Sequence, residues 1–192
     1  MRNRLRTAAA ALLLSALAGC ASNDGMTHLS VQKADGGDPY TASFERALFT
    51  ESPNGSTDLI LLSSGGVRQV VHIRVLWQPT RTIRIDSASA GNAMIDWLVS
   101  ASDKDRVVYG GSCWAKVSVD GDEAEVDLRE AAVSVRHVDG QMTDPLQRAN
   151  LSGKFVAKRA DASVRAYVDE MAAAGRRTAT AAALPKPLAV TP

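Results

Sequence analysis

The feature of this sequence that most constrains its fold is a series of short segments in which apolar and polar residues alternate, separated by turn residues. Side chains of a β-strand point alternately to the two faces of its sheet, so this alternation predicts strands with one dry face and one wet face. The clearest case follows Asp120-Gly121, a strong hairpin signal, where three acidic residues alternate with three apolar residues over 122–128. Strands and helices do not alternate regularly, which argues against a doubly wound nucleotide-binding fold.

About eight or nine strands are expected. The segments that predict them are 40–50, 58–63, 67–77, 82–86, 94–100, 106–109, 112–119, 122–128, 133–138 and 151–158. The first of these also fits one face of a helix, and the segment 82–86 is brief. So many short strands with intervening turns predict a mainly β domain over residues 40–175, built as an antiparallel β-sandwich or a curled sheet.

One helix is expected at the C-terminal end of this domain. Asp161 is expected to cap it and Gly175 to end it in the left-handed conformation, which gives a helix over 161–174. Its apolar residues recur at the spacing of one helix face and are Val164, Tyr167, Val168 and Met171. We expect this helix to pack on the sheet, and residues 176–192 to form a disordered tail.

The N-terminus has the layout of a secretory signal. Arginines at positions 2, 4 and 6 precede a stretch of small and apolar residues over 7–18, and the first acid is Asp24. As a helix, this stretch would cover about 18 Å, whereas the hydrocarbon core of a bilayer is about 30 Å thick. A signal sequence is therefore expected here rather than a membrane-spanning helix.

The apolar stretch ends in Leu17-Ala18-Gly19-Cys20, which resembles the lipobox of bacterial lipoproteins. The resemblance implies that residues 1–19 are a signal peptide cleaved before Cys20, and that the Cys20 thiol carries diacylglycerol. The aspartate that retains many such lipoproteins at the inner membrane is absent from position 21. The resemblance therefore implies an anchor at the periplasmic face of the outer membrane. Residues 20–39, which are polar and contain glycine, are expected to be a flexible tether.

The second cysteine, Cys113, matches part of the motif around the catalytic cysteine of papain-like proteases, in Gly111-Ser112-Cys113-Trp114. The motif of that family begins with a cysteine where this chain has Gly110, and the histidine and asparagine that it needs lie too far downstream for this chain. Cys113 also shares its strand parity with Ala115 and Val117. We therefore expect a buried thiol with no catalytic role.

Three histidines are present, and no two of them have the local spacing of a metal-ligand pair, so no metal site is expected. His72, Arg74 and Asp96 lie on two strands that would bring them together if those strands are neighbours. Such a group either binds an anion and tunes the histidine, or is a satisfied cross-strand cluster. Of the tryptophans, Trp77 and Trp97 are expected in the core and Trp114 at the surface.

The function expected from these features is that of a lipid-anchored envelope lipoprotein with a non-enzymatic partner-binding or assembly-accessory role. Loss of residues 1–19 removes three arginines and no acid, so the net charge changes from +1 to −2, which favours neither nucleic acid nor electrostatic membrane binding. No cofactor is expected, and the partners would be the membrane, through the lipid, and another envelope protein. The alternatives are a periplasmic carrier, which needs an enclosed cavity, and a small hydrolase, which needs a histidine beside an acid and a nucleophile.

Overall fold

The computed structural model describes residues 25–78, 91–144 and 146–182, with side chains as far as 173. The leader, Cys20 and the predicted strand 82–86 lie outside these ranges. Nine strands and one helix are present in the described part. They are β1 (Thr27–Lys33), β2 (Tyr40–Phe44), β3 (Arg46–Glu51), β4 (Thr57–Ser63), β5 (Arg68–Val75), β6 (Ala93–Ser100), β7 (Arg106–Asp120), β8 (Glu123–Asp139), β9 (Arg148–Arg159) and α1 (Asp161–Ala182).

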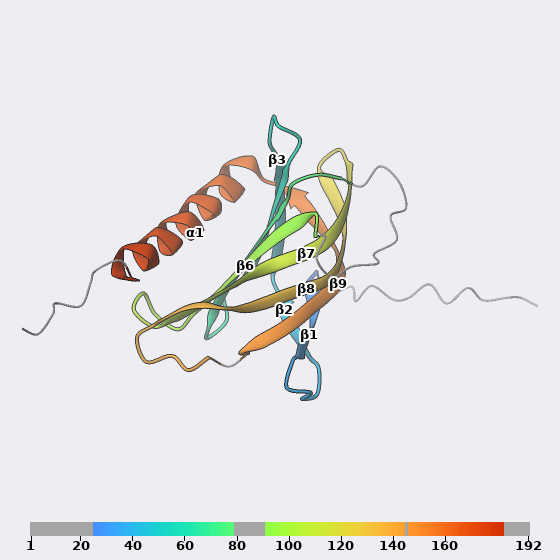
Figure 1. The fold of residues 1–192 in the computed structure, drawn as a ribbon. Helices are drawn as coiled ribbons and strands as arrows, with labels where there is room; N and C mark the ends of the chain where they lie inside the picture. Colours follow the sequence, from blue (N-terminus) through green and yellow to red (C-terminus); the bar gives the residue numbers. More distant parts are fainter. Residues whose placement is uncertain (1–24, 79–90, 145, 183–192) are drawn as a thin grey trace, which may run out of the picture.

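All nine strands belong to one sheet, in the order β2-β1-β9-β3-β4-β5-β6-β7-β8, and β8 pairs again with β9. Neighbours are antiparallel except β3 and β9, which run parallel where Leu48 meets Lys158 and Phe49 meets Arg159. Because β9 pairs with β8 along most of its length and with β3 at its end, the sheet curls round and closes on itself (Figure 1). The mainly β class is confirmed, and a single curled sheet is the architecture found.

The strands β7, β8 and β9 are longer than the sequence predicted, because residues expected to be turns continue the strands. Gly110 and Gly111 lie within β7, and the pairing of β7 with β8 shifts register after Val108 and again after Ser112. Such bulges let long strands bend, which the closure of this sheet requires. The predicted hairpin joins β7 to β8, with Gly121 at a φ of +57° in the first of two loop positions, as a type II′ turn requires.

The main core fills the inside of the curled sheet. Trp97 and Tyr109 are buried there with ring centroids 5.9 Å apart, and Phe44 contacts the other side of Trp97 at 6.5 Å. Trp97 therefore lies in the core as predicted. The prediction for Trp77 is wrong: β5 ends at Val75, and Trp77 is 44% exposed with its ring edge against Trp114.

Strand β1 lies in the segment expected to be a flexible tether, so that prediction is wrong for residues 27–33. Leu29 and Val31 are fully buried, and β1 pairs with β2 on one side and β9 on the other. Its dry face depends on only two large apolar residues, which is too few for the alternation to identify a strand without its neighbours. The part of the chain between Cys20 and the folded domain is correspondingly shorter than expected.

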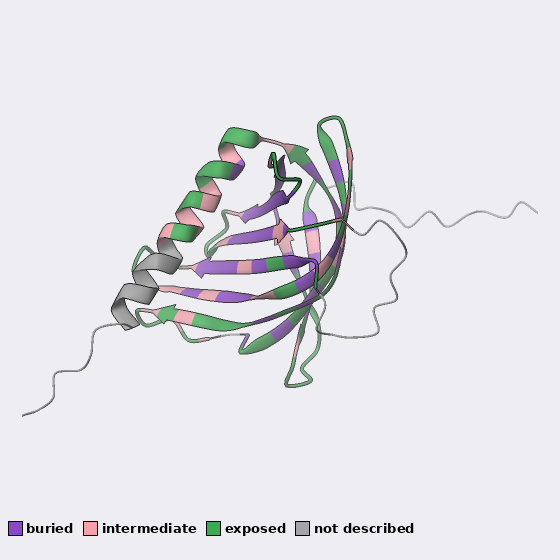
Figure 2. Cartoon of the chain, turned by 45° about the horizontal axis from the view of Figure 1, so that its top comes forward, coloured by how far each residue is buried: buried purple, intermediate pink, exposed green. Residues whose placement is uncertain are grey.

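Helix α1 lies along the outside of the sheet, beside β3 and β4 (Figure 1). The predicted stripe is confirmed: Val164 is fully buried, and Tyr167, Val168 and Met171 pack against a second apolar cluster. The sheet side of that cluster consists of Leu48, Ile60, Leu62, Val70 and Leu98. Figure 2 shows the exposed residues of the helix on its outer side.

The ends of α1 differ from the expectation. The carbonyl of Ala160 accepts the first helical hydrogen bond, from the Val164 amide, so Ala160 and not Asp161 is the N-cap. The Asp161 carboxylate accepts a hydrogen bond of 2.7 Å from the Thr50 hydroxyl. Gly175 does not end the helix, which runs through the first part of the predicted tail to Ala182. No helix within the described ranges is both long and apolar enough to cross a bilayer.

Candidate functional site

A pocket of about 360 Å³ lies between the outer face of the sheet and α1. Its walls are formed by His72, Arg74, Asp96, Val108, Arg136, His137, Val168, Met171 and Ala172. The three residues predicted from the sequence as a weak binding cluster, His72, Arg74 and Asp96, all line it. The pocket thus joins a polar floor on the sheet to an apolar wall that comes mainly from the helix.

The register of the sheet explains why these residues meet. Strands β4 to β8 lie side by side, and outward-facing residues of neighbouring strands form rows across them. His72 on β5 is directly opposite Asp96 on β6, and Asp96 is opposite Gly110 on β7. In the adjacent rows, Arg74 is opposite Asp58 on β4, and Val108 is opposite His137 on β8. The polar side chains of the pocket therefore lie together on the outer face of the strands β4 to β8.

The predicted contact between His72 and Asp96 is replaced by one between His72 and Asp58. The Asp58 carboxylate, which is buried, contacts the His72 ring nitrogen Nε2 at 2.8 Å and accepts a hydrogen bond of 2.7 Å from Arg74 Nε. Burial by itself raises the pKa of Asp58, but the hydrogen bonds and charges of His72 and Arg74 outweigh it, so the pKa is lowered. Asp58 therefore holds a negative charge beneath both residues and fixes their positions.

Asp58 is not among the predicted site residues, because it begins a segment, 58–63, that is otherwise mostly apolar. The alternation contained a usable signal: Asp58, Ile60 and Leu62 share one face, and a hairpin centred on Gly66 brings Asp58 opposite Arg74. Diagonal neighbours on one face of a sheet lie within reach of long side chains, which brings His72 to Asp58 as well.

Asp96 has a different partner, Arg136, which crosses from β8 over the intervening strand. Arg136 is the extra residue of a bulge in β8, since Val108 pairs with His137 and Tyr109 with Val135. Its Nη1 atom donates a hydrogen bond of 2.8 Å to Asp96. The guanidinium lies directly over Gly110, where a Cβ atom would overlap Nε and Cζ and would lie 2.6 Å from Cδ. The missing side chain of Gly110 is thus what lets Arg136 reach across β7.

The second pocket histidine, His137, is also held by a carboxylate. Its Nε2 atom contacts Asp139 at 2.5 Å, and Arg106 Nε donates to the other oxygen of Asp139 at 2.5 Å. Burial raises the pKa of Asp139, but the hydrogen bonds with Arg106 and His137 have the larger effect. The pKa of Asp139 is therefore lowered. Asp139 and Asp58 each contact a pocket histidine but are not among the described residues that line the pocket.

The helix wall is fixed in place by apolar contacts and by one ion pair. Val168 and Met171 face the pocket on the same stripe that buries Val164 against the sheet. Arg68 at the start of β5 makes a bidentate pair with Glu170 of α1, at 2.6 and 2.8 Å. This pair is exposed and adds little stability, but two parallel hydrogen bonds fix the direction of the helix over the sheet.

The described lining of the pocket combines basic, acidic and apolar side chains. Two guanidinium groups and one carboxylate line it together with two histidines, and none of the lining residues carries a hydroxyl, thiol or amine. The hydroxyl or thiol of a serine- or cysteine-type hydrolase is therefore absent from the described lining, whereas Asp96 and the two histidines are groups that can act in hydrolysis. Within the described ranges, no group of three or more histidine, cysteine, aspartate or glutamate side chains is placed to hold a metal ion.

Cys113 is confirmed as a core residue, remote from this pocket. It is 2% exposed on the inner face of β7, and burial raises the pKa of its thiol to about 12. A thiol reacts as its thiolate, so a group with such a pKa is inert near neutral pH.

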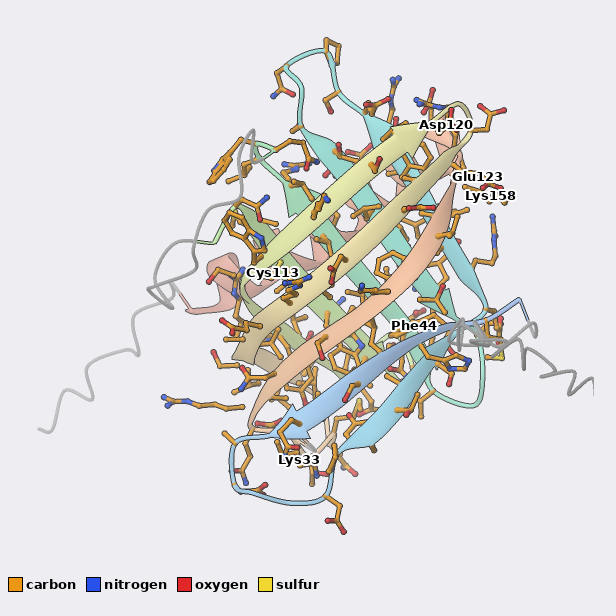
Figure 3. All side chains as sticks on the ribbon, turned by 90° about the vertical axis from the view of Figure 1, so that its right-hand side faces the viewer. Lys33, Phe44, Cys113, Asp120, Glu123 and Lys158 are labelled. Carbon is orange, nitrogen blue, oxygen red and sulfur yellow. The ribbon has the colours of Figure 1, made fainter. Side chains whose placement is uncertain are left out.

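A larger groove, of about 930 Å³, lies on the outer face of β8 and β9, beside Gly25 where the described chain begins. Its acidic residues come from the predicted wet face of the hairpin, and lysines of β7 and β9 balance their charge. Lys158 pairs with Glu123 next to the Asp120 turn, as Figure 3 shows, and Lys154 lies 3.8 Å from Asp127. These side chains are long and mostly exposed, so the groove has no preformed polar set, and we favour the smaller pocket.

Comparison of the chain with protein-family models, with curated proteins and with solved structures finds no match in any of the three. The functional assignment below therefore rests on the geometry of the pocket and on the sequence of the leader.

Proposed function

We propose that this chain is a lipid-anchored bacterial envelope protein with a non-enzymatic binding role, and that the pocket between α1 and the sheet is its binding site. The observation that supports a binding role most strongly is the organisation of the pocket floor. Each histidine and each arginine that lines it is held by a carboxylate: His72 and Arg74 by Asp58, Arg136 by Asp96, and His137 by Asp139. Groups fixed in this way lose little entropy when a ligand binds.

A binding role is favoured over the two alternatives by specific features. A carrier that encloses an apolar ligand needs an empty interior, whereas Trp97 packs against both Phe44 and Tyr109 within the main buried cluster of the curled sheet. A serine- or cysteine-type hydrolase needs a hydroxyl or thiol nucleophile, and no described residue of the pocket lining carries one.

The anchor is supported by the lipobox and by the position of the first strand. Strand β1 begins at Thr27, seven residues after Cys20. Seven extended residues span at most about 25 Å, so a lipid on Cys20 holds the start of β1 within that distance of the bilayer. The domain then stands close to the membrane surface, and its binding partner is a molecule at or near that surface.

The anchor is tested by intact-mass analysis of the full chain recovered from bacterial membranes. The expected mass lacks residues 1–19 and includes diacylglycerol on Cys20, and a Cys20→Ser chain is expected in the soluble fraction. An unmodified Cys20, or an uncut leader, would contradict the anchor.

The binding site is tested by cross-linking in living cells. A photoreactive amino acid is placed at Ala172, which lines the pocket, or at Ala166, which is exposed on α1 away from the pocket and serves as the matched control. We expect an adduct at position 172 that disappears in an Arg136→Gln chain, and none at position 166. Equal adducts at both positions, or an adduct that survives the loss of Arg136, would refute the assignment of the pocket.

A further inference from the structure

We infer that the pocket selects a small anionic group, a carboxylate or a phosphate, that carries a short apolar chain. This inference rests on the proposed binding role of the pocket and specifies what it binds. It follows from three features of the pocket: donors left unused by the two arginines, an excess of cationic groups on the lining, and an apolar wall on the helix.

The unused donors belong to Arg74 and Arg136. Among the described residues, Arg74 donates only from Nε, to Asp58, and Arg136 only from Nη1, to Asp96. Both amino groups of Arg74 remain, as do Nε and Nη2 of Arg136. A guanidinium presents its donors in a fork that matches the oxygens of a carboxylate or phosphate. The carboxylates thus orient the two arginines without using most of their hydrogen-bonding capacity.

The charge of the lining favours an anion. Asp96 is the only carboxylate on the lining, against two arginines, and no acidic residue of α1 lines the pocket. Asp58 and Asp139 contact the histidines but are not part of the described lining. Two arginines against one carboxylate make an anion the better-matched ligand, whereas a cation would have to compete with Arg136 for Asp96.

The apolar wall limits the rest of the ligand. Val108 on β7 and Val168 and Met171 on α1 face the polar floor across the pocket. A volume of about 360 Å³ lies near the lower end of the range for small-molecule sites, which is about 300–1,000 Å³. A head group bound to the arginines leaves room for a short hydrocarbon chain against this wall, and a long chain has to leave through the mouth.

The test uses the full chain with isotope-labelled methionine methyl groups and follows the Met171 signal by NMR during titration. The probes are sodium hexanoate and hexyl phosphate, with hexanol as the neutral control of equal chain length. Ligands of about eight to eleven non-hydrogen atoms are expected to bind with a dissociation constant on the order of 1 mM. The head group that binds more tightly identifies which of the two anions the pocket prefers.

The variant Arg136→Gln removes the guanidinium and keeps the stem of the side chain. Its matched control is Arg129→Gln, on the same strand, where the exposed guanidinium pairs with Asp127 outside the pocket. We expect affinity for the anions to fall about tenfold or more in Arg136→Gln and to stay unchanged in Arg129→Gln. Thermal melting of both variants verifies that the fold is retained, and Arg74→Gln supplies a second test should Arg136→Gln be unstable.

Three results overturn this inference: no effect of either anion on Met171, hexanol binding as tightly as hexanoate, or anion binding that both Arg136→Gln and Arg74→Gln leave intact. None of these results touches the binding role itself. If the photoreactive group at Ala172 captures a partner while no anion perturbs Met171, the binding site stands and the ligand class is wrong. If both experiments fail, the proposed function fails with them.

Discussion

Replacement of Asp58 by alanine is the perturbation whose cost the structure determines best. The substitution leaves the His72 ring, which is buried, and Arg74 Nε without their shared acceptor. A hydrogen bond to a charged group contributes about 1.5–3 kcal/mol when it is buried, which applies to His72. The Arg74 side chain is 42% exposed, so its pair adds only about 0–1 kcal/mol. We therefore expect Asp58→Ala to lower the free energy of unfolding by about 1.5–4 kcal/mol.

The assay is urea denaturation followed by circular dichroism, with the dependence on urea concentration compared between variants to verify a common unfolding reaction. Asp127→Ala is the matched control, because Asp127 pairs with Arg129 and Lys154 at the surface and its loss should change stability far less.

The pKa of Asp58 is lower in the folded chain than its ordinary value of 3.8. Its stabilising effect is thus complete above pH 3.8 and is lost as the pH falls below that value.

The difference between the parent chain and Asp58→Ala should accordingly shrink in acid. If Asp58→Ala is as stable as Asp127→Ala at neutral pH, or if the difference between parent and variant grows below pH 3.8, the account of the pocket floor is wrong.

Three further predictions concern positioning and packing. Gly110→Ala should displace Arg136 from Asp96 and weaken hexanoate binding as Arg136→Gln does, with a change in stability under about 1 kcal/mol because the displaced group is a flexible, half-exposed side chain; unaltered affinity in an NMR titration would contradict this. Val164→Ala should cost about 2 kcal/mol in urea denaturation, since it removes two buried methyl groups beneath α1, and a loss below about 0.5 kcal/mol would show that the helix is not anchored there. In a chain with Cys20→Ser, Cys113 should react with a thiol reagent only as fast as the protein unfolds, and rapid reaction of the native protein would mean that it is not buried.

The sequence predicted the class of fold because strand alternation reports the difference between wet and dry faces directly. The inward positions of β6 and β8, such as Trp97 and Val126, are buried as the pattern requires. Closure of the sheet was not predictable in the same way. The parallel contact of β3 with β9 joins residues about 110 positions apart, and no local pattern specifies such a pairing.

The limits at the level of single elements have local causes. Strand β1 escaped notice because only Leu29 and Val31 mark its dry face, and Trp77 was misplaced because β5 ends two residues before it. Gly175 was expected to end α1, yet a glycine inside a helix costs only about 1 kcal/mol relative to alanine, and the alanine-rich residues beyond it favour helix.

The candidate site was half predictable. His72, Arg74 and Asp96 could be grouped from their positions on two neighbouring strands, and all three line the pocket. Arg136 could not be found, because it enters through a bulge that shifts the register by one residue, and bulges leave no clear trace in a single sequence.

The measurement that tests the central claim most directly is a crystal structure of the chain with hexyl phosphate. The account predicts phosphate oxygens within hydrogen-bonding distance of Arg74 and Arg136, with the hexyl chain against Met171. A phosphate bound in the groove beside Gly25, or crystals that bind the ligand nowhere while the pocket stays open to solvent, would contradict it.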